Sequence, residues 1–179
     1  MRLTTILAPL ALAACSYVNL QTAASLSGFS PLTADPAQVR VAVDLPPGVD
    51  VAPGGAKLTF GAARSDTQAR EEGGFALEVL TGEANRKLFQ LSAADQAEFT
   101  RLQKLFTAWK EENESATSGQ LSIAVAACQV SSDLNEEDTF SVFIATDQTG
   151  RFKPLIQAAP VSEALALIKE AQGGSDAAC

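Results

Sequence analysis

Apolar and polar residues alternate along several stretches of the chain. Between Val39 and Leu45 every second residue is aliphatic, and Arg40, Ala42 and Asp44 lie between these aliphatic residues. A period of two places the aliphatic side chains on one face of a half-buried strand. The same reasoning predicts further strands at 56–62, 75–79, 121–125, 140–144 and 152–157, and a short additional strand at 88–91.

Turn residues mark the limits of two of these strands. Pro46-Pro47-Gly48 ends the first strand, and Gly73-Gly74 precedes the third. Within the third strand the alternation predicts that Phe75, Leu77 and Val79 all point toward the core.

Between 93 and 112 the apolar residues follow a helical period instead. Ser92 and Asp95 resemble a capping box with Asp in place of the commoner Glu. The predicted core face of this helix consists of Phe99, Leu102, Leu105, Phe106 and Trp109. A second, short helix is expected after Ser162, and its apolar face would be formed by Ala164, Leu165, Ile168 and Ala171.

The predicted order is strands, a helix, strands and a helix, without the alternation that is typical of parallel sheets. This order favours an α+β fold with an antiparallel sheet of about six to seven strands, one long amphipathic helix and a short C-terminal helix. A β-sandwich with a crossover helix is the alternative. A single domain would occupy residues 38–172, followed by a flexible tail at 173–179.

The chain begins with MRLTTILAPLALAAC. One basic residue, an apolar run and small residues at its end are typical of a secretory signal peptide, which would here comprise residues 1–14. The apolar run is too short for a membrane-spanning helix, which needs about 20 residues. We therefore expect the segment to be removed rather than to act as an anchor itself.

Leu12-Ala13-Ala14-Cys15 resembles the lipobox of bacterial lipoproteins. The resemblance covers the leader alone. It implies that the sulfur of Cys15 receives a diacylglyceryl group, that cleavage precedes Cys15, and that the new amino group is acylated as well. Two or three inserted chains give stable membrane anchoring, whereas one gives marginal binding. The alternative is an ordinary secretory leader cut after Ala14, which would leave Cys15 as a free or disulfide-bonded cysteine.

Ser16 follows the cysteine, at the position where an Asp would resemble the inner-membrane retention signal of Gram-negative lipoproteins. The resemblance therefore implies an outer-membrane lipoprotein that faces the periplasm. Residues 15–37 would form the lipidated N-terminus and a tether, because the stretch 16–34 carries no charge. The ends of such a stretch, as a flexible coil, would lie about 25 Å apart.

The chain of 179 residues has a net charge of −8 and contains no histidine. Without histidine, Ser-His-Asp and Cys-His nucleophile systems and imidazole-ligated metal sites are excluded. The acidic charge argues against nucleic acid as a partner, because the phosphates would be repelled. No cofactor is expected.

Cys128 and Cys179 are the cysteines that remain once Cys15 carries lipid. An oxidising compartment favours a disulfide between them. The tail before Cys179 is long enough to reach the strand that carries Cys128. Such a bridge would add about 4 kcal/mol of stability. A second interpretation, with Cys128 buried and Cys179 as a free thiol, stays open at this point.

Two clusters offer ligand groups without the spacing of a known motif. The first has oxygen ligands at alternate positions, as calcium sites do, but lacks the glycine and the bidentate glutamate of a calcium loop; it comprises Asp133, Asn135, Glu137 and Asp138. A solvated acidic turn is the simpler interpretation. The second cluster lacks the spacing of a phosphate-binding loop and is interpreted as turn residues; it comprises Gly48, Gly54, Gly55 and Lys57.

Function is indicated mostly by exclusion. The leading hypothesis is a non-enzymatic envelope lipoprotein whose domain binds an envelope protein or a cell-wall component. The small side chains of Ser122, Ala124 and Ala126 offer one surface that a partner can approach closely, and packing of this face against the helix is the equal alternative. The alternative is a carboxylate-based hydrolase of envelope glycans, which requires two facing acids, one of them with a raised pKa.

Overall fold

The computed structural model describes residues 31–83, 85–130, 135, 137–146, 149–162 and 179. Its elements are the short helix η1 (Pro36–Gln38), the long helix α2 (Ala93–Glu112), and strands β1 (Arg40–Asp44), β2 (Val49–Arg64), β3 (Arg70–Ala76), β4 (Glu78–Glu83), β5 (Arg86–Gln90), β6 (Thr117–Gln129), β7 (Thr139–Ala145) and β8 (Lys153–Pro160). The fold is α+β, as the sequence predicts.

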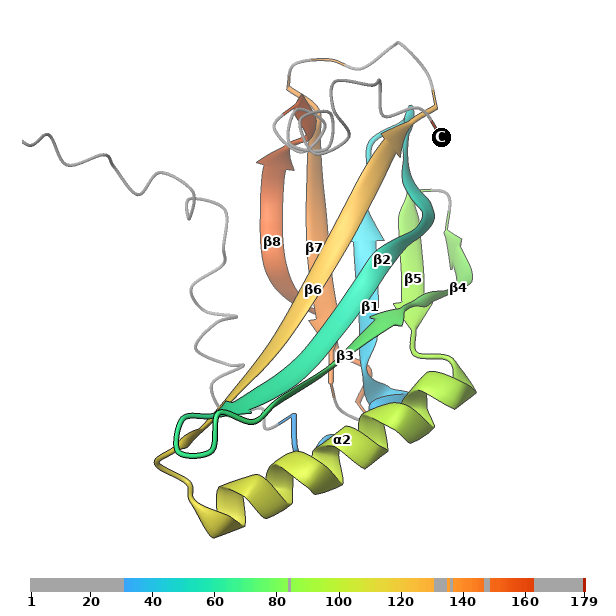
Figure 1. Ribbon diagram of the computed structural model, residues 1–179. Coiled ribbons are helices and arrows are strands. Elements are labelled where there is room, and N and C mark those ends of the chain that lie inside the picture. The colour runs from blue at the N-terminus through green and yellow to red at the C-terminus, as the bar shows by residue number, and fades with distance from the viewer. Residues whose placement is uncertain (1–30, 84, 131–134, 136, 147–148, 163–178) are drawn as a thin grey trace, which may run out of the picture.

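The strands form two antiparallel sheets. The larger sheet has five strands in the order β4-β5-β1-β7-β8, and the smaller has three in the order β3-β2-β6. Helix α2 follows β5 and precedes β6, so it joins the two sheets. Figure 1 shows β2 and β6 crossing in front of β1 and β7, with α2 along one end.

The prediction of one sheet with six or seven strands was wrong, because the described residues form eight strands in two sheets. One reason lies at Leu77, within the expected strand 75–79. Its N–H donates to the carbonyl of Ala56 in β2 at 2.8 Å, whereas Glu78 already pairs with Gln90 of β5. The alternation of side chains continues through this crossing, so it gives no sign that the chain changes sheets. The alternative prediction, a β-sandwich with a crossover helix, also has two sheets joined by a helix, and in this respect it agrees with the structure.

A second difference from the prediction is that β2 starts at Val49, well before the expected 56. The pairing of β2 with β6 shifts between Val51 and Ala56, so that Ala52–Gly55 form a bulge. Gly54 has a φ of +66°, which favours glycine, and a Cβ at Gly55 would lie 2.7 Å from the carbonyl oxygen of Ala52. These glycines therefore belong to a bulge inside a strand rather than to a turn between strands.

Both sheets and α2 contribute to one hydrophobic core. The ring of Phe60 in β2 stacks on Phe99 at 4.5 Å between centroids and meets Phe106 edge-on at 5.0 Å. On the predicted core face of α2, Phe99, Leu102 and Phe106 are buried. The remaining two residues of that face are half-buried and pack against the core: Leu105 and Trp109.

The ends of α2 follow the sequence closely. The Ser92 hydroxyl oxygen accepts the Asp95 N–H at 3.0 Å, which is the N-cap hydrogen bond of the predicted capping box. The same hydroxyl donates to the Asp95 carboxylate at 2.8 Å. Buried Gln103 donates from Nε2 to the carbonyls of Pro31 and Ala34, each at 2.7 Å. The part of the expected tether that the structure describes is therefore packed on α2.

Several expected features lie outside the described residues. These are the leader, Cys15, Asp133, the C-terminal helix beyond Ser162 and the tail up to 178. Within the ranges given above, no helix has the length and apolar character that are needed to span a bilayer.

Candidate functional site

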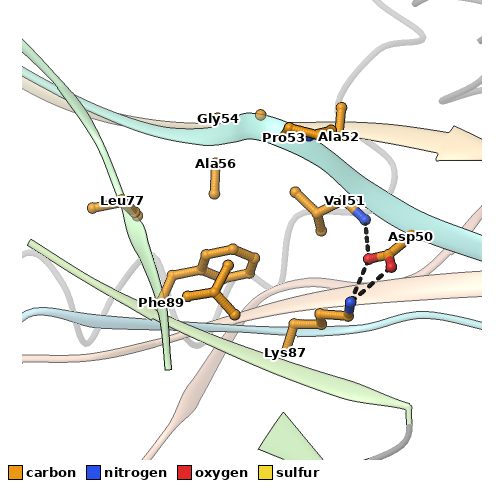
Figure 2. Close-up of a pocket in the computed structure, with 11 residues that line it drawn as sticks. Asp50, Val51, Ala52, Pro53, Gly54, Ala56, Leu77, Lys87 and Phe89 are labelled. Atoms are coloured by element: carbon orange, nitrogen blue, oxygen red, sulfur yellow. Dashed lines mark hydrogen bonds and ion pairs between the residues drawn. The ribbon is translucent and has the colours of Figure 1, made fainter. Parts of the chain in front are cut away.

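A pocket of about 240 Å³ opens between the two sheets, beside the point where the chain crosses from β3 to β4 (Figure 2). We call it the intersheet pocket. Its lining comprises Asp50, Val51, Ala52, Pro53, Gly54, Gly55, Ala56, Leu77, Val79, Lys87 and Phe89. The β2 bulge therefore supplies one wall, and β4 and β5 supply the other.

The floor of the intersheet pocket is apolar. Ala56, Leu77 and Phe89 are all at least 95% buried, with exposed fractions of 1%, 5% and 2%. Val79 pairs directly with Phe89, so the two side chains share one face of the sheet. Val79 was predicted to point into the core and instead is 65% exposed, because β4 is the edge strand and no described strand covers it.

An ion pair forms the polar wall of the pocket. The Lys87 Nζ of β5 lies 2.7 Å from the Asp50 carboxylate of β2, so the pair joins the two sheets. The same carboxylate accepts the N–H of Val51 at 2.6 Å. Both side chains are about one third exposed, at 36% and 33%, so solvent and a ligand can reach the pair.

The size and lining of the pocket limit what it can hold. A volume of about 240 Å³ lies below the range of about 300–1,000 Å³ that is usual for drug-sized ligands. One apolar side chain or a small apolar group fits this volume better than a cofactor does. The Lys87 ammonium has three donors, so those that Asp50 does not use can bind a carbonyl or carboxylate oxygen of the ligand.

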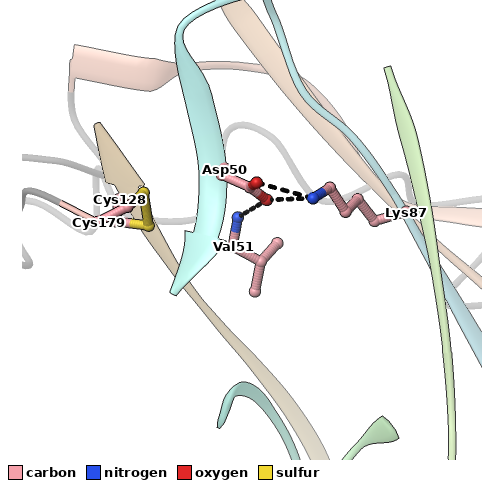
Figure 3. Close-up of a disulfide and its surroundings, with 5 residues drawn as sticks. All are labelled: Asp50, Val51, Lys87, Cys128 and Cys179. Carbon is pink, nitrogen blue, oxygen red and sulfur yellow. Dashed lines mark hydrogen bonds and ion pairs between the residues drawn. A yellow bond between two sulfur atoms is a disulfide. The ribbon is translucent and has the colours of Figure 1, made fainter. Parts of the chain in front are cut away.

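A disulfide lies close to the ion pair (Figure 3). Cys128 and Cys179 are bonded, with their Cα atoms 5.0 Å apart and a sequence separation of 51. Cys128 is directly opposite Asp50 in the pairing of β6 with β2. The bridge therefore holds the end of the chain against the same end of the molecule as the intersheet pocket.

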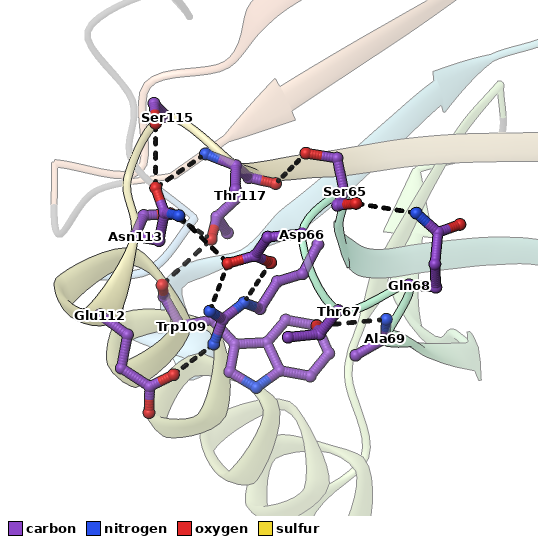
Figure 4. A network of polar contacts seen from close by, with 12 residues as sticks. Ser65, Asp66, Thr67, Gln68, Ala69, Trp109, Glu112, Asn113, Ser115 and Thr117 are labelled. Carbon is purple, nitrogen blue, oxygen red and sulfur yellow. Dashed lines mark hydrogen bonds and ion pairs between the residues drawn. The ribbon is translucent and has the colours of Figure 1, made fainter.

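A polar network at the other end of β2 joins the β2–β3 turn to the end of α2 (Figure 4). Arg64 donates to Asp66 at 2.8 and 3.0 Å and also pairs with Glu112. Asn113 donates to Asp66 at 3.1 Å and accepts the N–H of Ala116 at 3.2 Å. The hydrogen bonds from Arg64 lower the pKa of Asp66 to about 2, against the opposing effect of desolvation.

Neither Asp66 nor Glu98 has the raised pKa that the general acid of the hydrolase alternative requires. A general acid needs a raised pKa. The pKa of Asp66 is lowered, and that of Glu98 is lowered too, chiefly by the hydrogen bond from Arg101. Arg101 also binds Glu71 at 3.2 Å, so Glu71 and Glu98 are bridged by one guanidinium group rather than facing each other across a cleft.

The described members of the calcium candidate, Asn135, Glu137 and Asp138, lie in a turn. The Asn135 N–H donates to the Asp138 carboxylate at 2.8 Å, and the Asp138 N–H donates to the Asn135 carbonyl at 3.0 Å. Within the described part of the chain, no group of three or more potential metal ligands is present.

Sequence reasoning did not bring the residues of the intersheet pocket together. Asp50 and Lys87 are separated by 37 positions, and no local pattern indicates that they pair. Val79 offered a signal, since a strand at a sheet edge can expose a residue of its inward period, but the sheet order was not known. The assignment of the site rests on its geometry, because no protein-family model, curated protein or solved structure matches the chain.

Proposed function

We propose that the chain is an outer-membrane lipoprotein, anchored through Cys15 and facing the periplasm, whose domain is a non-enzymatic binding module for an envelope protein or a cell-wall component. The observation that carries the binding part is the intersheet pocket, which combines a buried apolar floor, the exposed Val79 and an accessible ion pair.

Two features of the cysteines support the anchor. Leu12-Ala13-Ala14-Cys15 has the pattern of a lipobox, and the bond between Cys128 and Cys179 leaves Cys15 as the remaining cysteine of the chain. Disulfides persist in oxidising compartments such as the periplasm, so the bond also supports export.

The path of the chain supports an outward-facing pocket. Gln103 holds the carbonyls of Pro31 and Ala34 on α2, so the segment that follows the anchor reaches the domain at the α2 end. Figure 1 shows the C-terminus, at Cys179, at the opposite end of the sheets. Asp50 pairs with Cys128 at that opposite end. An anchor at Cys15 would thus leave the pocket end free to meet a partner.

The chemistry of the pocket favours a peptide or protein partner. One apolar side chain would cover Val79 and Phe89, while a neighbouring carbonyl or carboxylate oxygen would meet Lys87. A lipid anchor raises the local concentration of both partners at one membrane, so a contact of this modest size suffices.

In-cell photocrosslinking tests the proposal. A photoreactive amino acid is placed at Val79 and, as the matched control, at Val130, which is 60% exposed and lies outside the pocket. We expect a discrete crosslinked species from position 79 and none from position 130. Replacing Cys15 by Ser should weaken the crosslink from position 79, because the domain is then no longer held at the membrane.

Equal crosslinking from both positions, or none from position 79 above background, would overturn the binding role of the pocket. A crosslink from position 79 that is unchanged by Cys15→Ser would retain the pocket but overturn the role of the anchor.

A further inference from the structure

The open edge of β6 is a second surface that needs a partner, and it is separate from the intersheet pocket. Sheet order leaves β6 at one side of the smaller sheet, with β2 as its single neighbour among the described strands. Along its other side an edge strand presents backbone N–H and C=O groups that can pair with another strand.

The other three sheet edges carry features that discourage pairing. β3 has seven residues, including Arg70, Glu71 and Glu72. β4 has six residues, begins and ends with glutamate, and changes register against β5. β8 contains Lys153, Pro154 and Pro160, and its pairing with β7 shifts twice.

None of these features occurs in β6. It has 13 residues, TSGQLSIAVAACQ, without a charge or a proline. The bulge in its pairing with β2 lies on the β2 side, in Ala52–Gly55. Long, uncharged and unbroken edges are rare in monomeric proteins because they pair with other strands.

The side chains of β6 also indicate that its open edge pairs with another strand. Leu121, Ile123 and Val125 pair with the buried Phe60, Leu58 and Ala56, so they point toward the core, yet all three are only half-buried. On the open side of β6 no described strand lies beside them. A neighbouring strand would cover these apolar side chains and pair the backbone at the same time.

We infer that this edge pairs with β6 of a second copy of the chain, antiparallel and about a two-fold axis near Ile123, so that the two smaller sheets become one continuous sheet. An antiparallel strand is complementary to itself about such an axis. The net charge of −8 opposes contact between copies elsewhere, whereas β6 brings no like charges together. Other sources of a strand, such as a different protein or a further segment of the same chain, are outcomes of the test.

Sedimentation equilibrium of the full chain carrying Cys15→Ser, which removes the lipid, measures this association. We expect a monomer–dimer equilibrium. Ser122→Lys places a charge on the exposed face of β6 beside the axis, and should weaken the dimer at least about ten-fold. Gly74→Lys is the matched control: Gly74 lies in the same row of the same sheet face, on β3, and has open space for a side chain.

A charge-swap mixture separates a specific contact from a loss of folding. Ser122→Lys and Ser122→Glu chains should each be largely monomeric, and an equal mixture should recover the dimer, since opposite charges then meet near the axis. Hydrogen exchange of the segment 117–129 should slow as the protein concentration rises.

Three results would overturn the inference. The first is a wild-type protein that stays monomeric at every concentration. The second is a dimer that Ser122→Lys and Gly74→Lys weaken equally. The third is protection of 117–129 from hydrogen exchange that is the same at all protein concentrations. The last result would mean that another segment of the chain covers the edge.

Discussion

Loss of the Cys128–Cys179 bond should measurably destabilise the domain, and the structure identifies the cleaner variant. Cys128 is 3% exposed and belongs to the buried set, so replacing it would also disturb packing. Cys179 is exposed at the chain end, so Cys179→Ser removes the bond and little else.

The magnitude follows from the length of the closed loop. With a sequence separation of 51, the loss of loop-closure entropy in the unfolded chain corresponds to about 4 kcal/mol. For a chain of this size each kcal/mol corresponds to about 2–4 °C in Tm. We therefore expect Cys179→Ser to lower Tm by about 8–16 °C.

Calorimetry of the oxidised wild type, the reduced wild type and Cys179→Ser checks this value. The reduced wild type and the variant should melt together, well below the oxidised protein, and mass mapping without reductant should recover the Cys128 and Cys179 peptides as one linked species. Coincident melting of all three samples would refute the reasoning, as would free thiols at both positions.

Three further changes test the core, the N-terminal contact and the polar network. Phe99→Ala removes a fully buried ring that stacks on Phe60, and should lower the free energy of unfolding by about 3–5 kcal/mol. Urea titration measures this loss, and a loss below about 1 kcal/mol would contradict the place of Phe99 in the core. Gln103→Met keeps the volume but leaves two carbonyls without their donor, and should make the chain near Pro31 more sensitive to protease, with unchanged cleavage as the contrary result. Asp66 has a folded-state pKa of about 2, below its ordinary value, so its stabilising contribution is present above about pH 4 and is lost as the pH falls toward 2. The free energy of unfolding of Asp66→Asn should therefore fall less steeply over that range than that of the wild type. Parallel curves of unfolding free energy against pH would contradict this.

The sequence predicted the local elements well where their signals are local. α2 has the predicted bounds, 93 to 112, because the Ser92 cap and the helical spacing of Phe99, Leu102 and Phe106 lie within one continuous segment. The strand near Val41 was recognised for the same reason: its period of two is uninterrupted.

The division into two sheets was not predictable, because it depends on pairing between distant segments. Leu77 continues the alternation of Phe75 while the backbone leaves β2 for β5. Pro53 and Gly54 resemble turn residues, although β6 continues opposite them and keeps them within one strand. The intersheet pocket lies at these two irregularities, and for that reason the sequence did not bring its residues together.

The proposed function requires a binding domain that is held on a membrane through Cys15. Intact-mass and peptide mass spectrometry of the protein from bacterial membranes tests this most directly. We expect an N-terminus at Cys15 that carries a diacylglyceryl group and an acyl chain, and a Cys15→Ser protein that is recovered outside the membrane fraction. A mature chain without lipid at Cys15, or a Cys15→Ser protein that stays on the membrane, would contradict it.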